Sequence, residues 1–133
     1  MKSRATFTAL LLLLVAVIAT GQVKSPDTNV GKRLTEFIAA VASGDEAVHK
    51  AFVEKSVSKE FREKHRVEQV LSFLNEIHDE EDSIEIVKIE KSSDYEVVAI
   101  MKGKSTGGFR VTIKTEDKEP FAIKGMGSQP VGQ

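Results

Sequence analysis

The stretch that decides the fold is residues 84–126, which read IEIVKIEKSSDYEVVAIMKGKSTGGFRVTIKTEDKEPFAIKGM. Apolar and polar residues alternate along much of it, and valine, isoleucine and phenylalanine are frequent, as is typical of β-strands. The pattern predicts four strands, at residues 84–90, 95–104, 108–116 and 120–126. The segments between them are short and rich in turn residues, so successive strands are expected to pair antiparallel, as a meander.

The side chains of two of these strands indicate how the sheet is covered. In the third strand, Phe109 and Val111 share a face with Ile113, and polar residues occupy the other face, so one face is expected to be buried. In the first strand the apolar face changes after Ile86, because Val87 lies on the opposite face. This slip predicts a bulge or a strand covered on both faces, and either would bend the sheet. Helices packed on one face of a curved sheet form a cone, whose open end can be a pocket.

Upstream of the strands, the apolar spacing changes to that of helices. A first helix is expected from Asn29 to Ser43-Gly44, and its apolar stripe follows the spacing i, i+4, i+7, i+8, i+11. The members of that stripe are Val30, Leu34, Phe37, Ile38 and Val41. Ser43 and Glu46 then fit a capping box that starts a second, short helix. The residues that this helix is expected to bury are Ala47, Val48, Ala51 and Phe52.

A third helix is expected from about Ser58 onward. Its apolar residues are Phe61, Val67, Val70, Leu71, Leu74 and Ile77. It runs into the acidic segment HDEED at residues 78–82. Negative charge is unfavourable at the negative end of the helix dipole, so this end is expected to fray into solvent. The fold class predicted is therefore α+β, with three N-terminal helices packed on a curved, four-stranded antiparallel meander.

The first 21 residues, MKSRATFTALLLLLVAVIATG, carry a basic start, an apolar run and small residues at the end. This is the pattern of a secretory signal peptide, and the run, residues 9–19, is shorter than the ~20 residues of a membrane-spanning helix. Cleavage after Gly21 is expected, which predicts a secreted or periplasmic protein without a stable membrane anchor; the alternative is a buried N-terminal helix. The rest of the chain divides into a flexible leader at 22–28, one domain at 29–127 and a flexible tail at 128–133.

Composition excludes several classes of function. The chain has 133 residues and no cysteine, so it has no disulfide, thiolate metal site or thiol nucleophile. A net charge of −1 gives no electrostatic reason to expect nucleic acid as a partner. A chain of this size can bury one core without covalent crosslinks.

Four segments carry a resemblance to a known family. They are GKRLTEF at residues 31–37, ASGD at 42–45, the stretch from Val67-Glu68 to Ile77-His78, and Ile123-Lys124-Gly125. On these residues, the chain from Gly31 to Pro130 resembles the NTF2-like (SnoaL-like) domains that accompany bacterial secreted serine hydrolases and S41-type peptidases. The resemblance implies a cystatin-like cone, a homodimer through the sheet face, and a separate secreted hydrolase or peptidase as partner. It implies a fold more strongly than a function, because the catalytic residues of NTF2-like enzymes have no counterpart assigned here.

Chemical motifs are sparse. The histidines, His49, His65 and His78, lack the H-x-H and H-x-x-x-H spacings, so no metal site is expected, and no cofactor motif is present. His49 and His65 are expected at solvated positions. His78, at the end of the third helix, is the best candidate for a catalytic residue. Tyr95 is expected to be an edge aromatic with a hydrated hydroxyl group.

Two further matches are interpreted as coincidences. Gly103-Lys104-Ser105 resembles the end of a phosphate-binding loop but lies between two predicted strands, and Ser56 and Lys59 form an isolated S-x-x-K pair.

The function predicted is an exported, non-enzymatic domain that binds a small apolar ligand or a protein partner. The alternatives are a small isomerase-like or hydrolase-like enzyme and an accessory module of a separate secreted hydrolase or peptidase. The candidate pocket residues are Phe37, Phe73, Ile77, His78, Met101, Phe109, Val111 and Ile123.

Overall fold

The computed structural model describes residues 23–105 and 107–131, in which four helices precede four strands. The helices are α2 (Asn29–Ser43), α3 (Glu46–Ser56), α4 (Lys59–His65) and α5 (Val67–Glu81). The strands are β1 (Glu85–Ser92), β2 (Glu96–Lys102), β3 (Phe109–Thr115) and β4 (Ile123–Pro130). The predicted α+β class is confirmed. The predicted signal peptide lies outside the described residues.

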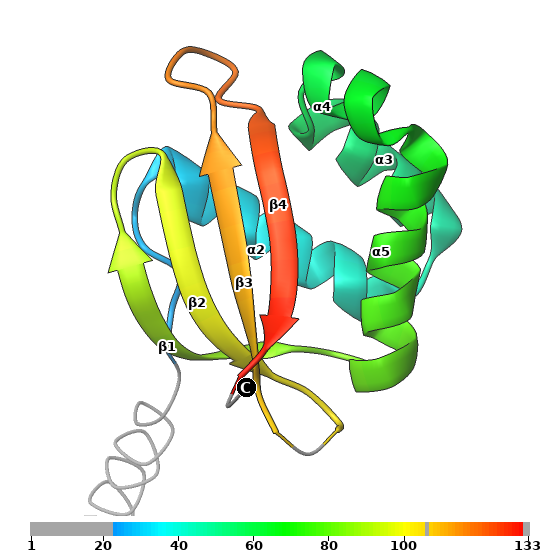
Figure 1. The fold of residues 1–133 in the computed structure, drawn as a ribbon, viewed down its shortest axis with the longest axis vertical. Helices are drawn as coiled ribbons and strands as arrows, with labels where there is room; N and C mark the ends of the chain where they lie inside the picture. Colours follow the sequence, from blue (N-terminus) through cyan, green and yellow to red (C-terminus); the bar gives the residue numbers. More distant parts are fainter. Residues whose placement is uncertain (1–22, 106, 132–133) are drawn as a thin grey trace, which may run out of the picture.

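The strands form one antiparallel sheet in the order β1-β2-β3-β4, so the predicted meander is confirmed (Figure 1). The pairing of β1 with β2 shifts register after Ile86, where the apolar face changes, and a second time after Ile89, where the sequence predicted no slip. The last strand runs over 123–130 and not 120–126. Residues 128–130, assigned to the tail in the sequence, pair with residues 109–111 of β3.

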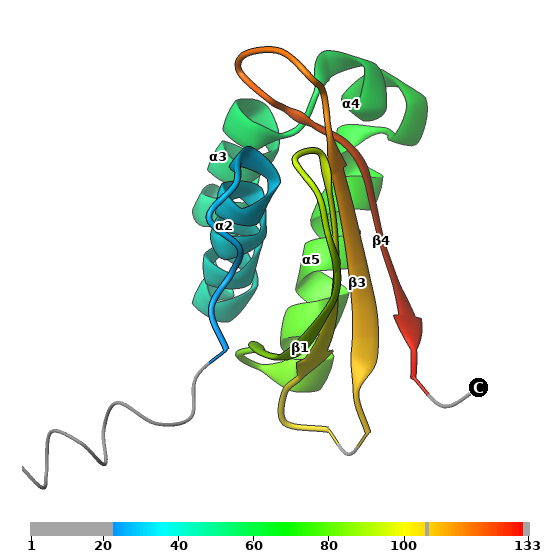
Figure 2. The ribbon, with the colours of Figure 1, turned by 90° about the vertical axis from the view of Figure 1, so that its left-hand side faces the viewer.

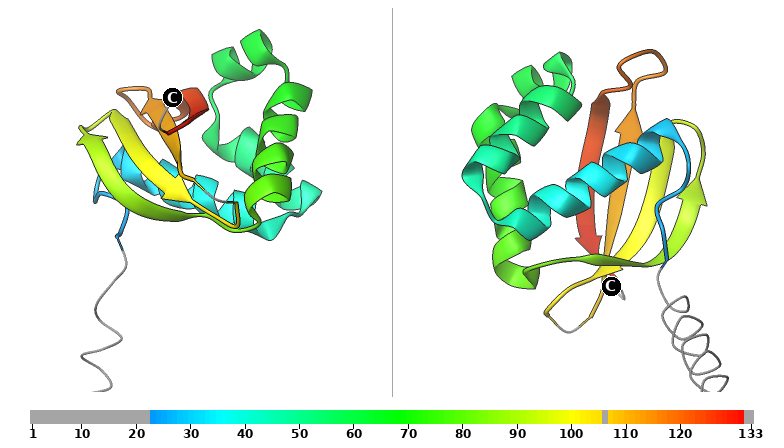
Figure 3. Two further views of the ribbon diagram at one scale, coloured as in Figure 1. Left: turned by 60° about the horizontal axis from the view of Figure 1, so that its bottom comes forward. Right: turned by 180° about the vertical axis from the view of Figure 1, so that it is seen from behind.

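Helix α2 follows its predicted stripe closely. The side chain of Thr28 accepts a hydrogen bond from the Gly31 amide at the start, and Gly44, with φ of 59°, ends the helix in the left-handed conformation that glycine favours. The helix crosses behind the sheet (Figure 3) and buries Leu34, Phe37 and Val41 against it. Figure 2 shows α2 and α3 on one side of the sheet, with the other face of the sheet uncovered by helices.

The prediction for α3 was wrong in its cap and, except for Phe52, in its buried face. Asp45, and not Ser43, caps the helix, because its carboxylate accepts from the amides of Ala47 and Val48. The buried side chains are His49, Phe52, Val53 and Ser56, whereas the predicted Ala47, Val48 and Ala51 are exposed. The apolar pattern predicted the wrong face because the buried face contains two polar residues. His49 and Ser56 are buried because they form hydrogen bonds with Ala40 and Glu36 of α2.

The third predicted helix is in fact two helices, α4 and α5, separated at Arg66. Arg66 has a φ of 58°, which a helix cannot contain. At 3.6 residues per turn, a continuous helix would turn Phe61 about 180° away from Val70. The break at Arg66 allows both side chains to face the rest of the protein, and Phe61 is half-buried while Val70 is buried.

The acidic end of α5 is not uniformly solvated. The helix continues to Glu81, which is buried, and its carboxylate accepts hydrogen bonds from the amide and hydroxyl of Ser105 at 3.0 and 2.6 Å. The amide of Lys104 also donates to the Glu81 carbonyl. The expected fraying is therefore opposed at this residue by a connection to the β2–β3 turn.

Candidate functional site

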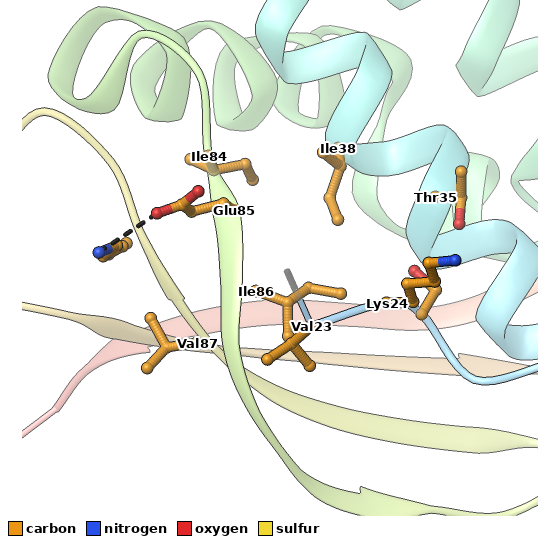
Figure 4. Close-up of a pocket in the computed structure, with 10 residues that line it drawn as sticks. Val23, Lys24, Thr35, Ile38, Ile84, Glu85, Ile86 and Val87 are labelled. Carbon is orange, nitrogen blue, oxygen red and sulfur yellow. Dashed lines mark ion pairs between the residues drawn. The ribbon is translucent and has the colours of Figure 1, made fainter. Parts of the chain in front are cut away.

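A groove with a volume of about 660 Å³ lies between α2 and β1. Its apolar residues are Val23, Ile38, Ile84, Ile86 and Val87, and its polar residues are Lys24, Ser25, Thr35, Glu85 and Lys102. We call this site the α2–β1 groove. Figure 4 shows Ile38 of α2 across from Ile84 and Ile86, with Val23 of the leader beside Ile86.

Three local features create the α2–β1 groove. Ile38 lies at the side of the α2 stripe and is only half-buried, so part of its side chain faces outward. Ile84 and Ile86 share a face of the chain at the start of β1, as alternation requires. The leader is kept close because Gly31 has no side chain, and a Cβ at that position would collide with the carbonyl oxygen of Pro26.

The rim of the α2–β1 groove carries charge. Glu85 and Lys102 form an ion pair at 3.2 Å, marked in Figure 4, whereas Lys24 makes no ion pair with any residue in the described ranges. An apolar wall beside an unpaired ammonium group suits a ligand with an apolar body and an anionic group. The groove has no catalytic constellation, since its titratable groups are two lysines and a glutamate at the rim.

Charged residues on the outer face of the sheet link β1 to β2 and β3. Arg110 donates to Glu90 through Nε at 2.6 Å and through a second nitrogen at 3.3 Å. This hydrogen bonding lowers the pKa of Glu90 and raises the pKa of Arg110. A hydrogen bond from Lys91 similarly lowers the pKa of Glu96. These are structural pairs on an open surface and do not form a pocket.

His49 and His78 occupy structural positions, and His65, expected at a solvated position, is half-buried beside Phe61, with ring centroids 4.4 Å apart. His49, expected at the surface, is fully buried, and its Nε2 donates to the Ala40 carbonyl at 2.8 Å. Its Nδ1 is buried and has no partner among the described residues. His78 has a side chain 26% exposed, and its Nδ1 lies 2.7 Å from the Val41 carbonyl and 3.0 Å from the Asp82 carbonyl. Because carbonyls only accept, this nitrogen carries the proton, and the ring joins the ends of α2 and α5.

Other buried polar groups are also engaged in holding elements together. Glu36 accepts from Ser56 at 2.7 Å and pairs with Arg33, which in turn donates to the carbonyls of Pro120 and Phe121. Ser56 therefore has a structural partner, while Lys59 of the S-x-x-K match is exposed. Tyr95 is exposed, beside a polar hollow.

The structure places most of the predicted pocket residues in the core. Phe37, Met101, Val111 and Ile123 are fully buried, and Ile77 is nearly so. Phe109 is half-buried against the core. Phe37 and Phe73 come together, with ring centroids 6.2 Å apart. Phe73 also lines a hollow of about 180 Å³ between α4, α5 and β4. None of the eight predicted residues lines the α2–β1 groove.

The residues of the α2–β1 groove were missed in the sequence for a simple reason. Ile38, Ile84 and Ile86 were recognised as apolar members of their elements, but nothing local indicates which apolar residues stay uncovered. Val23 lies in a polar leader without periodicity, and its role depends on where the chain is folded back.

Within residues 23–105 and 107–131, no helix has the length and apolar character needed to span a bilayer, and no three His, Asp or Glu side chains are grouped for metal binding. The chain matches no known family model, no curated protein and no solved structure.

Proposed function

We propose that this protein is an exported NTF2-like domain that binds an amphipathic small molecule, with an apolar body and an anionic group, in the α2–β1 groove. The observation that carries the proposal is the lining of the groove, where apolar side chains from the leader, α2 and β1 meet beside the unpaired Lys24. A binding role is favoured over catalysis because the buried polar side chains described above hold helices and turns together.

The anionic fluorophore 1-anilinonaphthalene-8-sulfonate tests this proposal, because it combines aromatic rings with a sulfonate. The protein is produced from the full chain, including its predicted signal peptide. The mass of the purified product reports whether cleavage occurs after Gly21. The probe is expected to bind with enhanced fluorescence.

Val23→Asp places a carboxylate against the apolar wall and is expected to weaken probe binding about tenfold, which corresponds to ~1.4 kcal/mol. Val48→Asp is the matched control, since Val48 lies outside the groove and is 41% exposed, against 44% for Val23. Equal loss in both variants, or no loss in Val23→Asp, would contradict the assignment of the groove.

A further inference from the structure

Strand β4 has an open edge. One side of β4 pairs with β3 along its length, from Ile123 to Pro130. On the other side, within the described residues, the only pairing is at its start, where Val57 bridges Ile123 and the Ser58 amide donates to the Ile123 carbonyl at 2.8 Å. Residues 124–130 therefore present unpaired backbone donors and acceptors, which can receive another strand.

Features that usually prevent strand addition lie at the two ends of β4. Its register shift lies at its beginning, opposite Lys114 and Thr115, and after Lys124 the strand contains no charged residue. At the other end, Pro130 has no backbone N–H to donate to an added strand. The segment from Gly125 to Gln129 is therefore regular and uncharged.

An apolar hollow lies beside this edge. It has a volume of about 180 Å³ and is lined by Phe61, His65, Gln69, Val70, Phe73 and Met126. Its walls come from α4, α5 and β4, and α4 and α5 lie on the β4 side of the sheet in Figure 1. A cavity of ~150 Å³ can hold benzene, so this hollow has room for one large apolar side chain.

Basic residues without an ion-pair partner occur on the elements that form the hollow, together with Glu60 and Glu63 of α4. Helix α4 and the residue after it carry Arg62, Lys64 and Arg66, and β4 carries Lys124; none of these four forms an ion pair with a residue that the structure describes. The Nε atom of Arg62 is also buried without an acceptor in that part of the chain. Carboxylates are the complementary groups for these cations.

From these observations we propose that the open edge of β4 binds an extended acidic peptide as a fifth strand. Its backbone pairs with residues 124–130, one bulky apolar side chain enters the hollow, and its carboxylates lie against the cations of α4. Strand addition with a side-chain pocket is an established mode of peptide recognition. The partner is an exported protein or peptide with such a segment, and this site is separate from the α2–β1 groove.

A synthetic probe tests the proposal by fluorescence polarisation. The probe is a fluorescein-labelled peptide of alternating valine and threonine with a central phenylalanine and two aspartates at one end. It is expected to bind the protein produced from the full chain. Replacing the phenylalanine with alanine, or the aspartates with lysines, is expected to weaken binding about tenfold or more.

Backbone methylation of the probe distinguishes strand addition from simple apolar contact. A strand presents alternate amides to its two sides, so methylating one set of alternate amides should abolish binding while methylating the other set should leave it intact. Equal effects of the two sets would overturn the proposal, and this result does not depend on the folding of any variant.

Matched variants locate the site. Arg62→Gln is expected to weaken probe binding about fivefold, and Lys88→Gln, which removes the same charge from β1 at the other edge, is expected to change it less than about twofold. Equal weakening would show that only net charge matters and would overturn the proposal.

The oligomeric state is a separate test. A dimer in sedimentation that persists when the probe is added would overturn the proposal in favour of a second copy of the chain. Sulfonate binding in the α2–β1 groove is measured in the same samples, so failure at one site is distinguishable from failure at the other.

Discussion

Strand β1 forms one edge of the sheet and β4 forms the other, and the two edges are protected by different means. The β1 edge has two register shifts, buried isoleucines at its start and charged side chains paired across to β2 and β3. The β4 edge is regular after its first residues and carries glycines and a half-buried methionine. Irregularity and charge close the first edge to other strands, whereas the second remains available. The β4 edge is therefore the one that we propose as an interaction surface.

The largest expected difference between the edges concerns stability. Ile86 is 8% exposed on β1, and Ile86→Ala is expected to lower the free energy of unfolding by about 3 kcal/mol through lost burial and a cavity. Met126→Ala on β4 is expected to cost less than about 1 kcal/mol, because Met126 is half-buried at the rim of a hollow. Urea unfolding measures both, and equal losses would refute the claim that β1 is the more firmly packed edge.

The second prediction concerns the hydrogen bonds between Glu81, which lies shortly before β1, and Ser105 of the β2–β3 turn. Glu81→Ala leaves the amide and hydroxyl of Ser105 without their acceptor, and is expected to cost about 2 kcal/mol. Glu80→Ala, at the exposed neighbouring position, is expected to change stability by less than about 0.5 kcal/mol. Similar unfolding midpoints for the two variants would mean that the Glu81 contacts do not stabilise this side of the sheet.

The third prediction sharpens the role of charge at the β1 side. Lys24→Gln is expected to weaken binding of 1-anilinonaphthalene-8-sulfonate about threefold, as removal of an exposed charge partner would. Binding of the uncharged N-phenyl-1-naphthylamine is expected to stay the same, because its contacts are apolar. Parallel titrations with the two probes separate the effects, and equal weakening of both would indicate a change in groove shape.

The smallest expected effect is the pH dependence of the ion pair between β1 and β3. Because Arg110 lowers the pKa of Glu90 from 4.5, the pair stabilises the fold above about pH 4.5, and this contribution is lost as the pH falls through the lowered pKa. Glu90→Gln is therefore expected to lose less stability than the parent protein between about pH 6 and about pH 3. Thermal unfolding at a series of pH values measures this, and parallel curves would show that the pair contributes nothing.

Much of the fold could be predicted from short-range patterns. The alternation of Val111 and Ile113 in β3 identified its buried face, and the change of phase after Ile86 identified a register shift. The apolar stripe of α2 identified its packing face. Each of these signals depends only on residues within one element, so one sequence contains them in full.

The remaining features depend on partners far away in the chain. His49 and Ser56 are buried because Ala40 and Glu36 of α2 supply hydrogen-bond partners, which no local pattern reports. The break between α4 and α5 arises because Phe61 and Val70 must both face the protein interior, which one continuous helix would not allow. The α2–β1 groove depends on where the leader lies, and most of the residues predicted for a pocket lie in the core.

The contact between His78 and Gly44 constrains which sequences this fold accepts. A side chain at position 44 would collide with the His78 ring, and the left-handed φ of 59° already disfavours most residues there. Shortening His78 would relieve the collision but would remove the donor that serves the carbonyls of Val41 and Asp82. Substitutions at these two positions are thus expected to be interdependent, tolerated together more readily than singly. In a set of divergent relatives, paired changes at 44 and 78 would be the signature of this one contact.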